Sequence, residues 1–151
     1  MIEIEISSDI SGRPYKDLLA ALWPLADSFS LIVRPDMEES RHLDETIRAL
    51  EPDRIGQREV SEWPGTILLD EVATCHEFRC TPNALAIAGS RSNSLFSWLQ
   101  PELPEDPALR RADGTVLLET IAHESIATLY LTGREAEQLD PILRALLRQA
   151  F

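Results

Sequence analysis

The chain has 151 residues, a length that fits one domain, and its hydrophobic content of 44% is enough for one sizeable core. Its 26 aspartate and glutamate residues outnumber its 14 lysine and arginine residues, which gives a formal net charge of −12. This balance argues against binding to nucleic acid or to an anionic membrane, and it favours a basic partner or none.

The N-terminal residues and the choice of basic residues bear on where the protein works. Glu3 and Glu5 stand where a signal peptide would begin its apolar run, and no basic residue precedes them. No apolar stretch approaches the roughly 20 residues that cross a bilayer. We therefore expect a cytoplasmic protein. Lys16 is the only lysine in the chain, a bias that is typical of GC-rich bacterial genomes.

The first elements along the chain are two strands separated by a helix. Isoleucines alternate with polar residues over residues 2–6, which predicts a half-buried strand. Pro14 suits the first turn of a helix, and regularly spaced leucines continue that helix to about Trp23, where Pro24 disfavours helical geometry. Residues 29–33 are apolar enough for a second strand.

An acidic helix is expected next. Leu43, Ile47 and Leu50 recur at helical spacing, which predicts an amphipathic helix from about Glu38 to Glu51 with an acidic outer face.

The middle of the chain gives weaker signals. Residues 61–65 read as a turn, and residues 66–80 are rich enough in β-formers for a strand or a bent hairpin, which the acids at 70 and 71 interrupt. A further helix is expected through Leu95, Phe96 and Leu99.

A proline-rich segment at about 100–107 is predicted to be a stiff internal strap. It holds three prolines in seven residues, which favours extended backbone, and its acids Glu102, Glu105 and Asp106 are expected to be exposed. The residues after it are too few for a comfortable second domain, so we expect one domain over 1–151.

The C-terminal part predicts a three-stranded antiparallel meander. Asp113-Gly114 is a hairpin signal for a type I′ turn between strands over 109–112 and 115–122. A second turn at 123–125 leads into a strand over 126–131.

A final helix closes the chain. Thr132 and Glu135 form a capping box, and Asp140-Pro141 indicates a kink or a second helix. The apolar stripe of this helix consists of Leu139, Ile142, Leu143, Leu146, Leu147 and Ala150.

Together the elements predict an α+β fold. We expect a single mixed or mainly antiparallel sheet with the C-terminal meander, and about four helices packed against that sheet.

Reactive side chains gather at Cys75, His76, Glu77 and Cys80, but their spacing does not suit a metal site. Zinc-binding pairs of cysteines stand closer together on a turn, whereas positions 75 and 80 point to opposite faces of a strand. We expect no metal and no cofactor.

An enzyme or ligand-binding domain is the first alternative function. Cys75 or Cys80 would be the nucleophile and His123 the base, with Glu124 or Glu77 orienting the imidazole. No glycine-rich phosphate-binding motif accompanies them, and the sequence favours a non-catalytic role.

The preferred function is protein–protein interaction. Between positions 36 and 71 the chain carries eleven acids and four arginines, which indicates either a solvated face or a docking surface for a basic partner. We expect an immunity- or inhibitor-like protein that covers a basic site. The expected contact residues are Glu38, Glu39, Asp44, Glu45 and Trp63, the last because aromatic residues concentrate binding energy.

A structural subunit is the second alternative. Leu139, Leu143, Leu146 and Leu147 of the final helix would then pack against a second copy of the chain as a homodimer.

Overall fold

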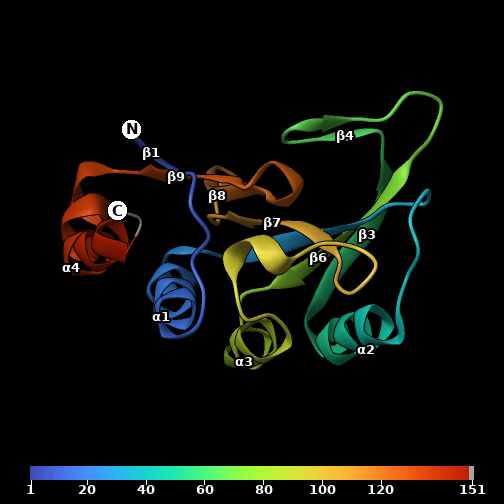
Figure 1. Ribbon diagram of the computed structural model, residues 1–151, viewed down its shortest axis with the longest axis horizontal. Helices are drawn as coiled ribbons and strands as arrows, with labels where there is room; N and C mark the ends of the chain where they lie inside the picture. Colours follow the sequence, from blue (N-terminus) through green and yellow to red (C-terminus); the bar gives the residue numbers. More distant parts are fainter. Residues whose placement is uncertain (150–151) are drawn as a thin grey trace.

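A seven-stranded antiparallel sheet lies at the centre of the computed structural model, which describes residues 1–149. The strand order is β1-β9-β8-β7-β2-β6-β3, and four α-helices accompany the sheet within the described part of the chain (Figure 1). The predicted α+β class with one mainly antiparallel sheet is confirmed. The strands of the sheet are β1 (Ile2–Ile6), β2 (Ser28–Val33), β3 (Arg54–Val60), β6 (Ala73–Arg79), β7 (Glu105–Arg110), β8 (Val116–Ile121) and β9 (Ile126–Leu131).

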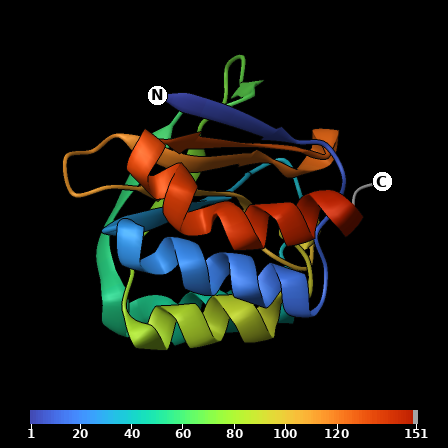
Figure 2. The same cartoon turned by 90° about the vertical axis from the view of Figure 1, so that its left-hand side faces the viewer.

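The helices lie on one side of the sheet in a row, in which α4 contacts α1, α1 contacts α3 and α3 contacts α2 (Figures 1 and 2). Their apolar faces bury the main core against the sheet. The four helices are α1 (Arg13–Leu22), α2 (Arg41–Leu50), α3 (Pro82–Arg91) and α4 (Gly133–Gln149).

Side-chain alternation on the strands divides the buried residues into two clusters. On β2, Phe29 and Leu31 belong to the main core, whereas Ile32 belongs to a smaller cluster with Ala73 and Cys75 of β6. Because successive side chains of a strand point to opposite faces, the smaller cluster lies on the face of the sheet away from the helices. That face carries the candidate site.

The acidic helix α2 begins later than its apolar periodicity predicts. Ser40 is the residue before its first turn, and the Ser40 hydroxyl accepts the Leu43 N–H at 3.1 Å, which satisfies one of the free amides of that turn. Glu38 and Glu39 therefore lie in the preceding loop, and only Asp44 and Glu45 of the expected contact residues lie on the helix.

The prediction of a helix through Leu95, Phe96 and Leu99 is wrong. The helix of this region is α3, which starts at Pro82 after a Thr81 cap whose hydroxyl accepts the Ala84 N–H at 3.0 Å. Its alanine-rich sequence gives little hydrophobic periodicity. Leu95 and Phe96 lie in a short 3₁₀ turn and are buried in the main core.

The proline-rich strap is partly a central strand, and the expected exposure of Glu105 and Asp106 is wrong. Residues 105–110 form β7, which pairs with β2 and β8, and Glu105 and Asp106 are only 2% and 4% exposed. A β-bulge opposite β2 explains how Pro107 is tolerated, because the register between these strands shifts there and Asp106 adopts a φ of 53°.

The meander and the capping box are confirmed. Strands β7, β8 and β9 are adjacent in the sheet, and β1 pairs with β9 at the edge. The turn at Gly114 is not type I′, since Asp113 does not share the positive φ of the glycine. Glu135 N–H donates to Thr132 Oγ1 at 3.1 Å, and Thr132 N–H donates to Glu135 Oε1 at 2.8 Å.

The final helix, α4, is a single helix that runs through Pro141. Of the apolar stripe, Leu139 and Leu146 are buried in the main core. The side chain of Leu147 and the whole of Ala150 lie outside the described residues.

Candidate functional site

Residues 61–72, which we call the arm, project from the sheet between β3 and β6 (Figure 1). Val60 and Ala73 are paired where the arm begins and ends. Within the arm, β4 (Glu62–Trp63) and β5 (Thr66–Ile67) form a short antiparallel hairpin around Pro64-Gly65. The arm folds over the face of the sheet that the helices leave open.

Two contacts fix the arm to the sheet. The indole N–H of Trp63 donates to Asp106 Oδ2 at 2.7 Å, so this tryptophan is an attachment point as well as part of the small hydrophobic cluster. Gly65, with a φ of 82°, lies so close to β8 that a β-carbon there would stand 2.5 Å from Ile121 Cγ1. Only glycine allows both this backbone conformation and this close approach.

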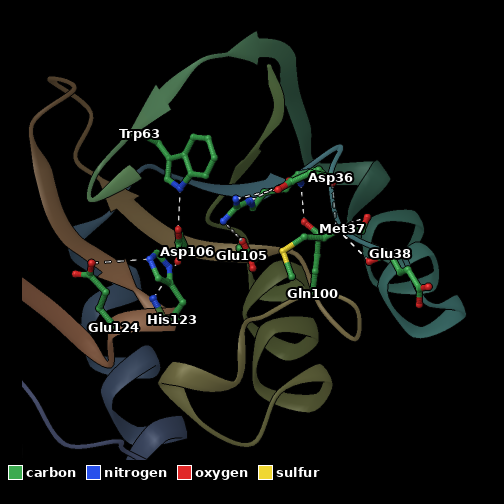
Figure 3. A network of polar contacts seen from close by, with 11 residues as sticks. Asp36, Met37, Glu38, Trp63, Gln100, Glu105, Asp106, His123 and Glu124 are labelled. Atoms are coloured by element: carbon green, nitrogen blue, oxygen red, sulfur yellow. Dashed lines mark hydrogen bonds and ion pairs between the residues drawn. The ribbon is translucent and has the colours of Figure 1, made fainter. Parts of the chain in front are cut away.

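Two adjacent buried carboxyl groups lie beneath the arm (Figure 3). Asp106 Oδ1 accepts the Ala122 N–H at 2.9 Å, so both of its oxygens have a donor. Glu105 Oε2 accepts no hydrogen bond and lies 4.0 Å from Arg34 Nη1. Burial raises the pKa of both groups, and for Glu105 the neighbouring Asp106 raises it further, whereas Arg34 opposes this shift.

A buried glutamine holds the loop beside this pair. Gln100 Nε2 donates to the carbonyl oxygens of Arg34 and Glu38 at 3.2 Å and of Met37 at 3.4 Å (Figure 3). Its Oε1 accepts the Arg34 N–H at 2.5 Å. The Arg34 side chain also pairs with Asp36 at 3.2 Å, so the loop that carries Asp36 and Glu38 has a defined path.

We expect the substitution Glu105→Gln to raise the free energy of unfolding at pH 7 by about 1 kcal/mol, because it removes a buried charge with an oxygen that accepts no hydrogen bond. The pKa of Glu105 is raised above its ordinary 4.5, so ionisation costs more in the folded chain than in the unfolded chain. Wild-type stability therefore falls, relative to the variant, as the pH rises through that raised pKa.

Urea denaturation at two pH values measures this difference. The two proteins should be about equally stable at roughly pH 3, where the carboxyl is largely neutral in both states. Glu102→Gln, at an exposed neighbour, is the control and should change little at either pH. A Glu105→Gln variant that is less stable than wild type at pH 7 would contradict the expectation.

A groove of about 680 Å³ lies between the arm and the sheet. Ser30, Ile32 and Ala108 line it from β2 and β7, and Trp63 and Pro64 line it from the arm. The charged residues that line it are Arg58, Glu62, Asp106, Arg110 and Glu119.

Comparisons with models of protein families, with curated proteins and with solved structures found no match. Within residues 1–149, no helix is long and apolar enough to cross a membrane. The site therefore has to be interpreted from its own chemistry.

In the part of the chain that the structure describes, neither Cys75 nor Cys80 makes a hydrogen bond or ion pair with His123, the residues that the enzyme alternative needs together. Burial raises the pKa of the Cys75 thiol, and it raises the pKa of the Cys80 thiol to about 12. Both thiols therefore stay protonated at neutral pH and are weak nucleophiles. His123 is exposed and lies 3.9 Å from Glu124.

Nor does His76 have the surroundings of a ligand or a base. Its Nδ1 lies 3.1 Å from Arg54 Nη1, and burial, together with that guanidinium, lowers its pKa to about 4. Among the described residues, no group of three or more histidine, cysteine, aspartate or glutamate side chains could hold a metal ion.

One end of the sheet gathers acidic side chains from several loops, and we call it the acidic end. Val33 pairs with Thr74 and Val60 with Ala73, so the loop after β2 and the arm leave the sheet at the same end. The loop before β7 reaches it too, because Glu105 pairs with Ile32, and the turn after β8 lies beside it, because Ala122 N–H donates to Asp106 Oδ1. The exposed acids here are Asp36, Glu38, Glu39, Glu62, Asp70, Glu71, Glu102 and Glu124.

The structure separates the expected contact residues. Glu38 and Glu39 belong to the acidic end, and Trp63 attaches the arm there. Asp44 and Glu45 lie on α2, where Glu45 pairs with Arg41 at 2.9 Å and with Arg91 at 3.8 Å. The role of all five in partner binding stays a prediction.

Sequence reasoning missed Gln100, Glu105 and Asp106 as site residues. Their proline-rich setting indicated an exposed strap, and no local pattern signals that a glutamine will reach backbone carbonyls more than 60 positions away.

Proposed function

We propose that this protein is a non-catalytic domain that binds a basic protein partner at its acidic end. The observation that carries the proposal is the charge of that end. Its loops hold eight exposed acids and one arginine, Arg34, which is already paired with Asp36 and lies near Glu105. A surface of one sign in this arrangement attracts an oppositely charged protein and speeds its association.

Exposed apolar side chains on the arm support the same function. Ile67 and Leu69 are 71% and 83% exposed, and Val72 is 45% exposed. The arm has no basic residue and carries Glu62, Asp70 and Glu71 beside them. Apolar residues within an acidic surround suit a partner surface in which apolar contacts are ringed by lysine and arginine.

The more specific form of the proposal is an inhibitor. Carboxylates at the acidic end would cover a basic active site, such as that of a nucleic-acid-cleaving toxin, in the place of substrate phosphates. This step rests on chemical analogy between carboxylate and phosphate as partners of arginine and lysine.

Charge reversal at the acidic end tests the proposal. We expect Glu38→Lys combined with Glu39→Lys to weaken capture of the partner at least about tenfold at low salt, because two attractive charges become repulsive. The partner is identified beforehand by capture with the immobilised wild-type protein, and its affinity is measured with purified components. Both side chains are exposed, so the melting temperature should change little.

The matched control is Asp44→Lys combined with Glu45→Lys, which makes the same change of charge on α2. We expect this control to retain most of the affinity. Equal losses in both variants would show a general field effect and no local docking site. Unchanged binding in the first variant would place the docking surface elsewhere.

A further inference from the structure

We propose that the groove beneath the arm is a binding site for a small organic anion with a flat apolar body, such as an aromatic carboxylate. This goes beyond the proposed function, because the groups that would hold the anion are arginines of the groove, whereas the acidic end would hold a basic protein. The groove has a volume of about 680 Å³, within the range of sites that enclose small molecules.

Two arginines supply the positive charge of the groove. Arg110 on β7 is half-buried, donates one hydrogen bond to Ser30 Oγ at 3.3 Å, and makes no ion pair with any residue of the described chain. Arg58 on β3 pairs with Glu77 at 3.0 Å and is more exposed. Both residues line the groove, and β3 and β7 lie on either side of β2 and β6 in the sheet, so the two arginines reach the groove from opposite sides.

Three of the six carboxylate oxygens that line the groove accept a hydrogen bond, whereas Arg110 donates a single one to the described residues. Asp106 accepts from Ala122 and Trp63 with its two oxygens. Glu119 accepts the Tyr130 hydroxyl at 2.6 Å. A guanidinium has five N–H groups and suits a planar carboxylate with two parallel hydrogen bonds. Near Arg110 the groove thus has donor capacity to spare, whereas Glu62 is an exposed side chain of the arm.

The remaining walls suit an apolar ring. Ile32, Val60 and Ala108 lie along the sheet, and the arm adds Trp63 and Pro64. Aromatic and proline side chains pack well against a flat ring, and apolar walls strengthen a charged hydrogen bond by excluding water. The size and chemistry of the groove therefore favour a single ring system with one carboxylate.

Three probes with the same indole body test the sign of the charge: indole-3-acetate, indole-3-acetamide and tryptamine. In a ¹H–¹⁵N spectrum of the wild-type protein, the Trp63 indole N–H, assigned with a Trp63→Phe variant, reports on the groove. Indole-3-acetate should shift this resonance with a dissociation constant on the order of 1 mM, as expected for so small a ligand. The buried Trp23 and Trp98 should not respond.

The variant Arg110→Gln should weaken binding of indole-3-acetate at least about tenfold, because a charged bidentate contact is lost. Arg79→Gln, an exposed arginine at the end of β6 outside the groove, should bind like wild type. The proposal is overturned if indole-3-acetamide binds as tightly as indole-3-acetate, or if tryptamine binds more tightly. It is also overturned if indole-3-acetate leaves the Trp63 indole resonance unchanged. These ligand comparisons use the wild-type protein and hold even where Arg110→Gln fails to fold.

Discussion

The substitution Tyr15→Phe is expected to lower the free energy of unfolding by roughly 3 kcal/mol. The Tyr15 hydroxyl, fully buried between α1 and α3, donates to the Ala88 carbonyl at 2.8 Å and accepts the Trp98 indole N–H at 3.1 Å. Phenylalanine keeps the shape of the ring, but the Ala88 carbonyl loses the hydroxyl donor and the Trp98 indole N–H loses its acceptor. Each such buried group costs about 1 to 3 kcal/mol.

A shift of the thermal midpoint by about 6–12 °C measures the loss in a domain of this size. Burial raises the pKa of Tyr15 to about 12, so the hydroxyl is protonated throughout the neutral range in which the melt is recorded. Tyr130→Phe is the matched control, because its hydroxyl donates to Glu119 at a partly exposed site where water can replace it. Equal effects of the two substitutions would contradict the argument from burial.

The substitution Asp106→Asn is expected to lower the free energy of unfolding by about 2 kcal/mol and to weaken the attachment of the arm to the sheet. Asp106 accepts two N–H groups, one from Trp63 and one from Ala122, with its two oxygens. Asparagine fits the positive φ of this position, but its amide offers one oxygen and one NH₂ group. In either orientation of the asparagine amide, its NH₂ group faces one of these two N–H donors.

A double-mutant cycle with Trp63→Phe measures how much of this destabilisation depends on the contact between Trp63 and Asp106. Phenylalanine removes the indole donor, so Asp106→Asn should cost less in the Trp63→Phe background than in the wild type, by on the order of 1 kcal/mol. Chemical denaturation gives the energies, and limited proteolysis within residues 61–72 reports whether the arm has loosened. Additive costs would mean that the Trp63–Asp106 contact contributes nothing to the attachment of the arm.

Local chemistry explains which elements the sequence revealed. The alternating isoleucines of β1 and the capping box of Thr132 and Glu135 each involve residues close in the chain, and both appear as predicted. The fold class followed from the order of such elements. The start of α2 was misplaced by three residues because apolar spacing marks the buried face of a helix, whereas Ser40 marks where the backbone becomes helical.

The candidate site was less predictable because long-range contacts build it. β7 reads as a proline-rich strap until β2 and β8 are placed on either side of it. The acidic end combines loops that are up to 88 positions apart, from Asp36 to Glu124. Periodicity along the chain identified an acidic segment, but sheet pairing decides which of its acids lie together.

The pairing of Val60 with Ala73 also bears on how this protein could diversify. These two residues continue the ladder between β3 and β6, so the twelve residues between them form an insertion within one hairpin. The seven-stranded ladder does not run through that insertion, which meets the rest of the molecule mainly at Asp106, Ile121 and the small cluster around Cys75. Changes of length or sequence there would alter the outward surface while the register of the sheet stays the same. The pairing of the strands therefore places little constraint on the length of the arm.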